Sequence, residues 1–319
     1  MAGRILVIRG GALGDFILTL PAIRLLREKF PDSPLEVLGH LHIATLAEGR
    51  YYASSIRSIE SSRLSAFFHP DAPLDPELCR YFAGFDQILS YIYDHDKVFQ
   101  SRLRMAGAQN LISASPKIGQ DGHAARQLAR PLQQFSMRLE DPAARIFPSA
   151  ADLSEAQVLL SGLVRPLVAI HPGSGSKSKN WPLERWLQVQ AEILRNRKVG
   201  HLLVVGGESD FPQLSRMRRA ASSRQTVLTN LPLPLLGSVL SRCSLFIGHD
   251  SGVSHLAAAA GARCLLIFGP TNPDVWAPAN DAVEVLRAND AQISSLETEL
   301  VLGRMNETLN DVSRNDCVR

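Results

Sequence analysis

Short apolar runs alternate with amphipathic segments along the whole chain. The apolar runs have the length of buried strands, and segments with helical periodicity follow most of them. The expected strands lie near residues 4–8, 35–38, 55–60, 86–91, 109–113, 166–171, 200–205, 225–228, 244–248, 263–268 and 282–286. Strands that alternate with helices are typical of parallel sheets, so the pattern predicts an α/β fold.

The chain is long enough for two domains. With 319 residues it can build two cores of ordinary size. Pro131, Pro142 and Pro148 interrupt the pattern near its middle and mark a crossover. We expect a first domain over residues 1–145, a second over residues 150–290, and a helical tail over residues 291–319.

A glycine-rich turn joins the first expected strand to the first helix. Gly10, Gly11 and Gly14 lie in this turn, and Asp15 follows at once. Such a turn is typical of a Rossmann-like half. The glycine spacing does not fit the dinucleotide fingerprint, and no acidic residue closes the next strand. Asp15 either caps the helix or presents an ionised carboxylate to a ligand.

A second strand–turn–helix motif lies near the C-terminus. The expected strand at 244–248 runs into Asp250, Ser251 and Gly252, and an Ala-rich helix begins there. Free N–H groups and the helix dipole at such a start favour an anion such as phosphate. A capped helix without a ligand is the alternative. Asp250 could either cap the helix or contact a sugar hydroxyl. His255 could either contact a ligand or pack in the core as a neutral side chain.

A third strand–turn–helix segment follows the strand at 166–171. Ser174 and Gly175 let the backbone wrap an anion, and Lys179 supplies charge beside Trp181. The segment is not a Walker A loop, because Ser176 stands where that motif needs glycine. Further on, Glu208 follows a strand and two glycines. Its carboxylate could either accept hydrogen bonds from ribose hydroxyls or stand at a helix N-terminus without a ligand.

One tripeptide resembles a metal site. Asp94-His95-Asp96 could hold a divalent cation, but it precedes a helix, where aspartate caps are routine. We favour the helix-start interpretation and expect no metal site in the chain.

Composition excludes several classes of protein. A net charge of +3 and a pI near 8.7 do not favour nucleic-acid binding. The region 97–145 holds eight Lys/Arg against three acids, which suits an anionic acceptor or membrane surface, although a solvated helix face is commoner. Cys79, Cys243, Cys264 and Cys317 have no metal-ligand spacing, and no apolar run is long enough to span a bilayer. We expect a cytoplasmic protein with reduced thiols.

Taken in order, the motifs resemble glycosyltransferase family 9, the family of the lipopolysaccharide heptosyltransferases. The matching segments are Arg9-Gly-Gly-Ala-Leu-Gly-Asp-Phe-Ile-Leu-Thr-Leu-Pro21, His171-Pro-Gly173, Lys179-Asn-Trp-Pro-Leu-Glu-Arg-Trp186, Gly206-Gly-Glu208, Asp250-Ser-Gly252 with His255, and Gly269-Pro-Thr271. The resemblance implies a GT-B architecture of two facing Rossmann-like domains with a cleft between them. It implies that the first domain binds the acceptor and the second the nucleotide sugar, and that the tail helix packs back toward the first domain.

The resemblance also implies an inverting transfer with Asp15 as general base. Lys179, Ser174 and the amides of Ser251 and Gly252 would meet the leaving diphosphate in place of a metal, and Glu208 would bind ribose. The family's best-known donor is ADP-heptose, and its acceptors are glycolipids or lipopolysaccharide cores, which implies peripheral contact with the inner membrane. A nucleotide-sugar epimerase of the same architecture, or a family 9 transferase with another donor and acceptor, stays open as an alternative.

Overall fold

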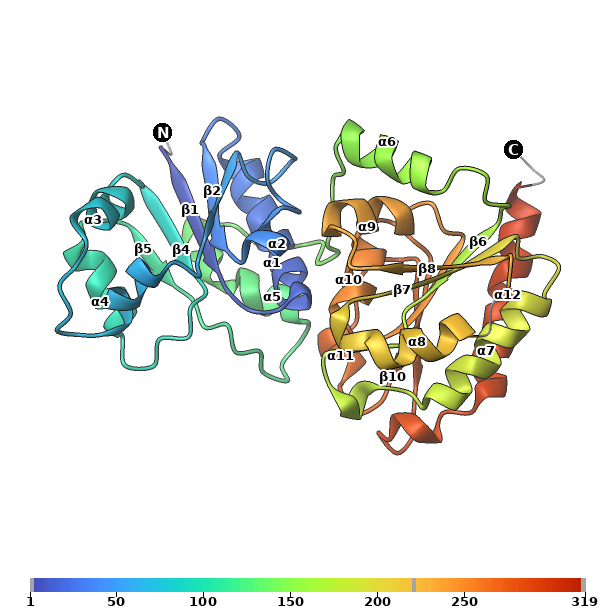
Figure 1. The fold of residues 1–319 in the computed structure, drawn as a ribbon. Helices are drawn as coiled ribbons and strands as arrows, with labels where there is room; N and C mark the ends of the chain where they lie inside the picture. The colour runs from blue at the N-terminus through green and yellow to red at the C-terminus, as the bar shows by residue number, and fades with distance from the viewer. Residues whose placement is uncertain (1–2, 220–221, 317–319) are drawn as a thin grey trace. The chain divides into compact units, whose positions relative to one another are not determined.

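The computed structural model describes residues 3–219 and 222–316. The chain divides into two compact units, Met1–Pro142 and Ala143–Arg319 (Figure 1). Each unit contains one parallel sheet with helices packed on it. Figure 1 shows the first unit in blue to green and the second in green to red.

The first unit has a five-stranded sheet in the order β3-β2-β1-β4-β5, with all neighbours parallel. Its strands are β1 (Ile5–Arg9), β2 (Leu35–Gly39), β3 (Ser55–Ser58), β4 (Gln87–Ser90) and β5 (Leu111–Ser113). Its helices are α1 (Leu13–Lys29), α2 (Leu41–Ala44), α3 (Pro76–Ala83), α4 (Val98–Met105) and α5 (Ala124–Ala129), with the 3-10 helices η1 (Ser62–Phe68) and η2 (Arg130–Phe135).

The second unit has a six-stranded parallel sheet in the order β11-β10-β9-β6-β7-β8. Its strands are β6 (Leu167–Ile170), β7 (His201–Gly206), β8 (Gln225–Thr229), β9 (Leu245–His249), β10 (Cys264–Phe268) and β11 (Val283–Arg287). Its helices are α6 (Ala150–Leu159), α7 (Leu183–Arg195), α8 (Phe211–Arg219), α9 (Leu233–Leu240), α10 (Gly252–Ala259), α11 (Pro273–Trp276) and α12 (Thr298–Asp316), with η3 (Lys177–Lys179), η4 (Glu208–Asp210) and η5 (Ile293–Ser295).

The strand orders place a switch point in each sheet. In the first unit the chain moves from β1 outward to one edge and then returns to add β4 on the other side. The second unit repeats this pattern around β6 and β9. Open α/β sheets bind ligands beyond the carboxyl ends of the two strands at such a point. The predicted Rossmann-like α/β class is confirmed, and each expected strand is present within a few residues.

The central strands owe their position to continuous apolar runs. Every residue of β1, β6, β9 and β10 is buried, as expected for parallel strands covered on both faces. In the second unit the core continues to Trp181 and Trp186, whose rings meet edge to face at 5.6 Å between centroids. Both tryptophans are almost fully buried, so they anchor the loop that precedes α7.

The tail helix α12 packs on the second unit. Val301, Met305 and Leu309 on one side of the helix are buried in the core of the second unit, against α7. Their spacing of four residues creates an apolar stripe, and α7 supplies a matching surface. The expected packing of this helix toward the first domain stays a prediction.

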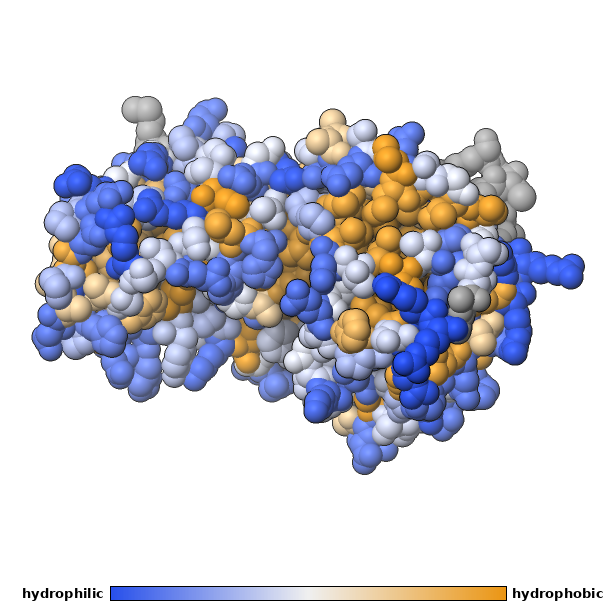
Figure 2. Space-filling model, in the orientation of Figure 1, coloured by the Kyte–Doolittle hydropathy of each residue, from blue (hydrophilic) through white to orange (hydrophobic). Residues whose placement is uncertain are grey.

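The second unit also exposes apolar side chains. Figure 2 shows apolar residues gathered around α6 and the segments beside it. Within α6 only Ala156 is buried, whereas Leu153, Val158 and Leu159 are exposed. In the described part of the chain, no helix is both long and apolar enough to cross a membrane.

Three of the four cysteines lie in the described residues. Cys79, Cys243 and Cys264 are free thiols, as expected, and Cys317 lies outside the described residues. Burial raises the pKa of Cys243 and of Cys264 to about 12, so neither is a reactive thiolate.

Candidate functional site

In the first unit, the turn after β1 is shaped around Asp15. Gly11 has a positive φ of 93°, and a Cβ there would lie 2.9 Å from Asp15 Oδ2. Asp15 occupies the third position of α1, and its Oδ2 accepts the Ala12 N–H at 3.0 Å. Asp15 therefore caps α1, as one of its two interpretations predicts. Gly10 and Gly14 flank this cap, before and within the first turn of the helix.

A buried arginine holds Asp15 from the other side. An Arg9 guanidinium nitrogen lies 3.5 Å from Asp15 Oδ1, and Arg9 Nε donates to the Thr19 hydroxyl at 3.0 Å. Burial lowers the pKa of Arg9, and the Asp15 carboxylate only partly offsets this. The Asp15 side chain is 38% exposed, whereas that of Arg9 is 3% exposed. The carboxylate is thus fixed in orientation yet open to solvent.

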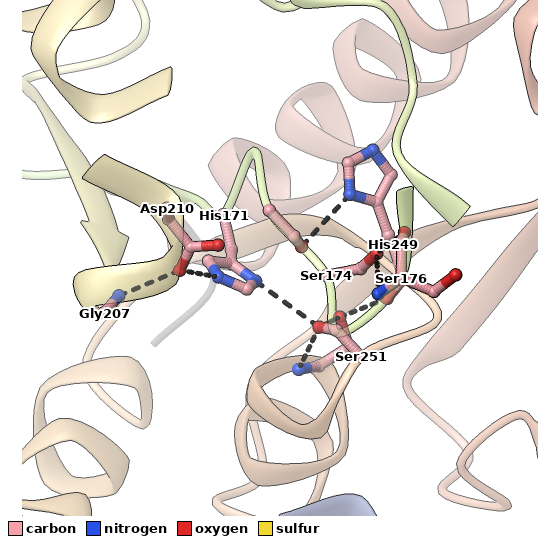
Figure 3. Close-up of polar contacts among 9 residues, drawn as sticks. His171, Ser174, Ser176, Gly207, Asp210, His249 and Ser251 are labelled. Carbon is pink, nitrogen blue, oxygen red and sulfur yellow. Dashed lines mark hydrogen bonds and ion pairs between the residues drawn. The ribbon is translucent and has the colours of Figure 1, made fainter. Parts of the chain in front are cut away.

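In the second unit, the ends of β6, β7 and β9 meet through three buried side chains (Figure 3). His171 Nε2 lies 3.1 Å from Asp210 Oδ2, and His171 Nδ1 lies 3.3 Å from Ser251 Oγ. Ser251 is the N-cap of α10, where its Oγ accepts the Ser254 N–H at 3.3 Å. The serine rather than Asp250 therefore caps this helix. The His171 ring therefore joins two side chains from the segments that follow two other strands.

The Asp210 carboxylate holds two strand ends together. Its Oδ2 also accepts the Gly207 N–H at 2.8 Å, at the end of β7. Burial favours the neutral acid, but the hydrogen bond from His171 and the Gly207 N–H outweigh burial and lower the pKa of Asp210. A Cβ on Gly173 would lie 1.8 Å from Asp210 Oδ1, so only glycine fits there.

His249 locks the loop after β6 onto the end of β9. Its Nε2 accepts the Trp181 backbone N–H at 2.9 Å and the Trp186 indole N–H at 3.0 Å. Its Nδ1 lies 3.2 Å from the Gly173 carbonyl oxygen, so this nitrogen carries the proton and donates. Complete burial lowers the pKa of His249 to about 3, which keeps the ring neutral.

Lys179 and Asp250 form an ion pair. Lys179 Nζ lies 2.7 Å from Asp250 Oδ2, and the Thr271 hydroxyl donates to the same oxygen at 2.7 Å. The lysine comes from η3, the aspartate from the end of β9 and the threonine from the end of β10. The Asp250 side chain is 8% exposed and that of Lys179 30% exposed. An ion pair therefore lies beside the start of α10.

The remaining predicted residues take different positions. The Ser174 hydroxyl donates to the Ser176 carbonyl oxygen at 2.7 Å, so Ser174 shapes its own loop. Gly175 and Glu208 are exposed, and Gly252 begins α10. His255 is buried on α10. The structure thus brings Lys179, Asp250 and Ser251 together and leaves Glu208 exposed on η4, after β7.

Three residues of this region were not predicted as site residues. His249 is the last residue of the apolar strand β9. Its sequence position alone gives no sign that it accepts hydrogen bonds from two tryptophans. Asp210 follows Gly207 by three residues, which is a cap spacing that could have indicated it. Thr271 belongs to a matched motif, but nothing in the sequence pairs it with Asp250.

Asp94 acts as a helix-start residue. Its carboxylate oxygens accept the N–H groups of Phe99 at 3.1 Å and Gln100 at 2.8 Å, in the first turn of α4. Both oxygens of this carboxylate therefore accept hydrogen bonds from backbone N–H groups. Among the described residues no group of three or more His, Cys, Asp or Glu side chains has the proximity of a metal site.

A basic groove of about 430 Å³ lies on the first unit near α5 and η2. Arg126, Arg130 and Arg138 line it together with the acids Asp121 and Glu140. Arg126 donates to the Leu139 and Glu140 carbonyl oxygens, and Arg130 donates to the Asp121 carbonyl oxygen at 2.9 Å. These bonds of Arg126 and Arg130 go to backbone carbonyl oxygens rather than to carboxylates.

The two parallel α/β units match the GT-B architecture of two Rossmann-like domains. Residues 123–304 match the sequence model of glycosyltransferase family 9 (heptosyltransferase). The chain belongs to this family, and it is a glycosyltransferase.

Individual relatives agree with the family. The chain is similar to lipopolysaccharide heptosyltransferase 3 of Escherichia coli, with 23% identity over 295 residues that cover 83% of each chain. Its fold is similar to a family 9 glycosyltransferase from Veillonella parvula, with a TM-score of 0.80, 20% identity and 97% of each chain covered. It is also similar to the E. coli heptosyltransferase WaaC solved with ADP, with a TM-score of 0.71, 16% identity, and 96% and 99% covered.

Proposed function

We propose that this glycosyltransferase moves a heptose from ADP-heptose to a glycolipid or lipopolysaccharide-core acceptor, by an inverting, metal-independent displacement. The observation that carries the proposal is the cluster at the ends of β6 and β9, where Lys179 and the N-terminus of α10 lie beside each other in a family 9 chain. The family match favours transfer over the epimerase alternative.

Charge complementarity supports a diphosphate at this cluster. The start of α10 offers free N–H groups and the positive end of its dipole, and the ammonium group of Lys179, held by Asp250, lies beside it. Ser174 and Gly175 form the facing loop, and the exposed Glu208 is free to accept ribose hydroxyls. These groups would stabilise the leaving diphosphate without a metal. ADP is the proposed nucleotide because a family relative is solved with it.

Asp15 is the proposed general base. In the transfer, an acceptor oxygen forms a bond to the anomeric carbon while the bond from that carbon to the diphosphate oxygen breaks. The diphosphate leaves with the bonding electrons, and the acceptor proton passes to Asp15. The exposed, oriented carboxylate at the start of α1 suits this role. One carboxylate suffices for a single displacement with inversion.

The acceptor is proposed to be anionic. The arginine-lined groove near α5 lies in the acceptor domain that the family resemblance implies, and its charge suits a phosphate or carboxylate on a glycolipid. Peripheral contact with the inner face of the cytoplasmic membrane, and the cytoplasmic location, stay predictions. The exposed apolar side of α6 would allow such contact.

Calorimetric titration with nucleoside diphosphates tests the donor proposal. The full chain, in excess EDTA, should bind ADP more tightly than GDP, UDP or dTDP. Matched titrations with added Mg²⁺ should give the same affinity. Loss of ADP binding in EDTA, together with the same loss in Asp94→Ala, would restore the metal interpretation. If another nucleoside diphosphate binds more tightly than ADP, its nucleotide replaces ADP in the proposed donor.

A further inference from the structure

Arg9 is a charged residue at the end of a fully buried strand. It is the last residue of β1, and its side chain is 3% exposed. A guanidinium at such a position needs partners, because a buried charge without them is costly. Among the described residues, Asp15 is the one carboxylate within ion-pair distance of Arg9. The proposed function uses this carboxylate but gives the arginine no part in the reaction.

The Arg9 side chain bridges the end of β1 and the first turns of α1. One terminal guanidinium nitrogen donates to the Asp15 carbonyl oxygen at 3.2 Å and lies 3.5 Å from Asp15 Oδ1. Arg9 Nε donates to the Thr19 hydroxyl at 3.0 Å, and this hydroxyl donates in turn to the Asp15 carbonyl oxygen at 2.7 Å. Arg9 therefore contacts both the main chain and the side chain of Asp15.

Tyr91 supports the guanidinium from the segment after β4. The centre of its ring lies 5.7 Å from Arg9 Cζ, and its hydroxyl donates to the Leu128 carbonyl oxygen at 2.7 Å. Tyr91 is fully buried, and burial raises its pKa, so the phenol stays neutral. Thr19 is also fully buried. The guanidinium is thus enclosed by uncharged groups on the inside and meets its counter-charge at Asp15.

The Asp15 carboxylate is held through both of its oxygens. Oδ2 accepts the Ala12 N–H at 3.0 Å, and Oδ1 lies opposite the Arg9 guanidinium. A carboxylate has about four lone-pair sites, so it keeps acceptor capacity beyond these two contacts. The Asp15 side chain is 38% exposed, so a ligand can reach it. Without Arg9, the Ala12 N–H would hold a single oxygen and leave the other free to turn.

We propose that Arg9 is a positioning residue, whose guanidinium fixes the Asp15 carboxylate in the orientation that takes the proton from the acceptor hydroxyl. The inference rests on the proposed function, in which Asp15 is the general base. A general base must lie within hydrogen-bond reach of the proton that it removes. A displacement of about 1 Å in a reacting group can cost about a hundredfold in rate.

Turnover of Arg9→Met tests this role. Methionine replaces the arginine with an apolar side chain, and the carboxylate left behind is exposed enough to be solvated, so no unpaired buried charge remains. We expect kcat for heptose transfer from ADP-heptose to fall about ten- to hundredfold. ADP affinity, measured by calorimetry, should not change, because the proposed donor groups belong to the second unit.

A double variant separates positioning from structure. In the Asp15→Asn background, Arg9→Met should change kcat by less than about twofold, because the arginine acts through the carboxylate that is already lost. Arg102→Met is the matched control. Arg102 is also a buried arginine of the first unit, but its guanidinium donates to the Pro70 and Ala72 carbonyl oxygens. This control should lower the melting temperature and leave kcat unchanged.

Thr19→Val keeps the test decisive if Arg9→Met does not fold. Valine has nearly the shape of threonine but lacks the hydroxyl, so Arg9 Nε loses its partner while the ion pair with Asp15 stays. We expect kcat to fall several-fold in the wild-type background and not to fall further in the Asp15→Asn background.

Two patterns would overturn the inference. One is a normal kcat in folded Arg9→Met or, where that variant does not fold, in Thr19→Val. The other is a loss of kcat that is as large in the Asp15→Asn background as in the wild type, which would assign Arg9 a purely structural role. If the wild type transfers no heptose, or if Asp15→Asn transfers it at the wild-type rate, the proposed function itself fails, and this inference fails with it.

Discussion

Lys179 Nζ lies 2.7 Å from Asp250 Oδ2, so the lysine proposed to meet the donor is held in place by a carboxylate. The same oxygen accepts the Thr271 hydroxyl. Asp250 is largely buried and orients Lys179 beside the start of α10. Loss of the lysine would therefore remove a cation and also leave a buried carboxylate close to the phosphate subsite.

Lys179→Ala is expected to weaken ADP binding about ten- to hundredfold, the scale of a lost charge-assisted hydrogen bond, and to leave adenosine binding nearly intact. Calorimetric titration with the two ligands measures this difference. Lys177→Ala is the matched control, because Lys177 lies in the same 3-10 helix but is exposed. Equal losses for ADP and adenosine would mean that Lys179 is structural.

Glu208→Ala is expected to act on the ribose instead. It should weaken adenosine and ADP binding by a similar factor, because both ligands carry the same ribose hydroxyls. The factor should disappear with 2′,3′-dideoxyadenosine, which lacks these hydroxyls. If Glu208→Ala weakens dideoxyadenosine as much as adenosine, the carboxylate does not bind ribose.

The layers of the fold could be predicted from the sequence because buried parallel strands have a recognisable composition. Strands that are buried on both faces consist of short runs of apolar residues. The structure has β6, β9 and β10 at such runs. The turn motifs after β1 and β9 were equally visible, since glycine and small hydroxylated residues are needed there. The positions of Asp15 and Ser251 at the starts of helices were therefore predicted from local pattern alone.

Contacts between distant segments could not be predicted in this way. The pair of Lys179 with Asp250 joins residues 71 positions apart, and that of His171 with Asp210 joins residues 39 apart. The hydrogen bonds of His249 could not be predicted, because a histidine at the end of an apolar run carries no signal of its partners. The contact of the tail helix with α7 was not predicted, because an apolar stripe on a helix does not show which surface covers it.

The buried His249 predicts a loss of stability in acid. Its pKa falls from 6.5 to about 3 on folding, so between these values the unfolded chain binds a proton that the folded chain does not. The free energy of unfolding should therefore decrease as the pH falls below 6.5, by about 1.4 kcal/mol per unit from this group. Urea unfolding at pH 5, 6 and 7 measures the slope.

His249→Gln is the comparison variant. It loses hydrogen bonds to the two tryptophans, so it should be less stable at pH 7. Its stability should nevertheless fall less steeply with acid than that of the wild type. The same slope in both proteins would show that another group causes the acid sensitivity.

Asp15 needs a careful control because it also caps α1 and pairs with Arg9. Asp15→Asn keeps the cap but removes the charge beside a buried guanidinium, so a lower melting temperature is expected. Asp75→Asn is the matched control. Asp75 also accepts N–H groups at a helix start, from Glu77 and Leu78 on α3, and its pKa is lowered to about 2 by Arg63. This control should lower the melting temperature and leave turnover unchanged.

The most direct test of the account is the turnover of Asp15→Asn, measured as heptose transfer from ADP-heptose at a temperature where the variant is folded. If Asp15 is the general base, turnover should fall by about 10²–10⁴, because the acceptor hydroxyl loses the group that takes its proton. ADP affinity should stay nearly unchanged, since the proposed donor groups belong to the second unit. A lower melting temperature with near-normal turnover would contradict the account and leave Asp15 as a helix cap alone.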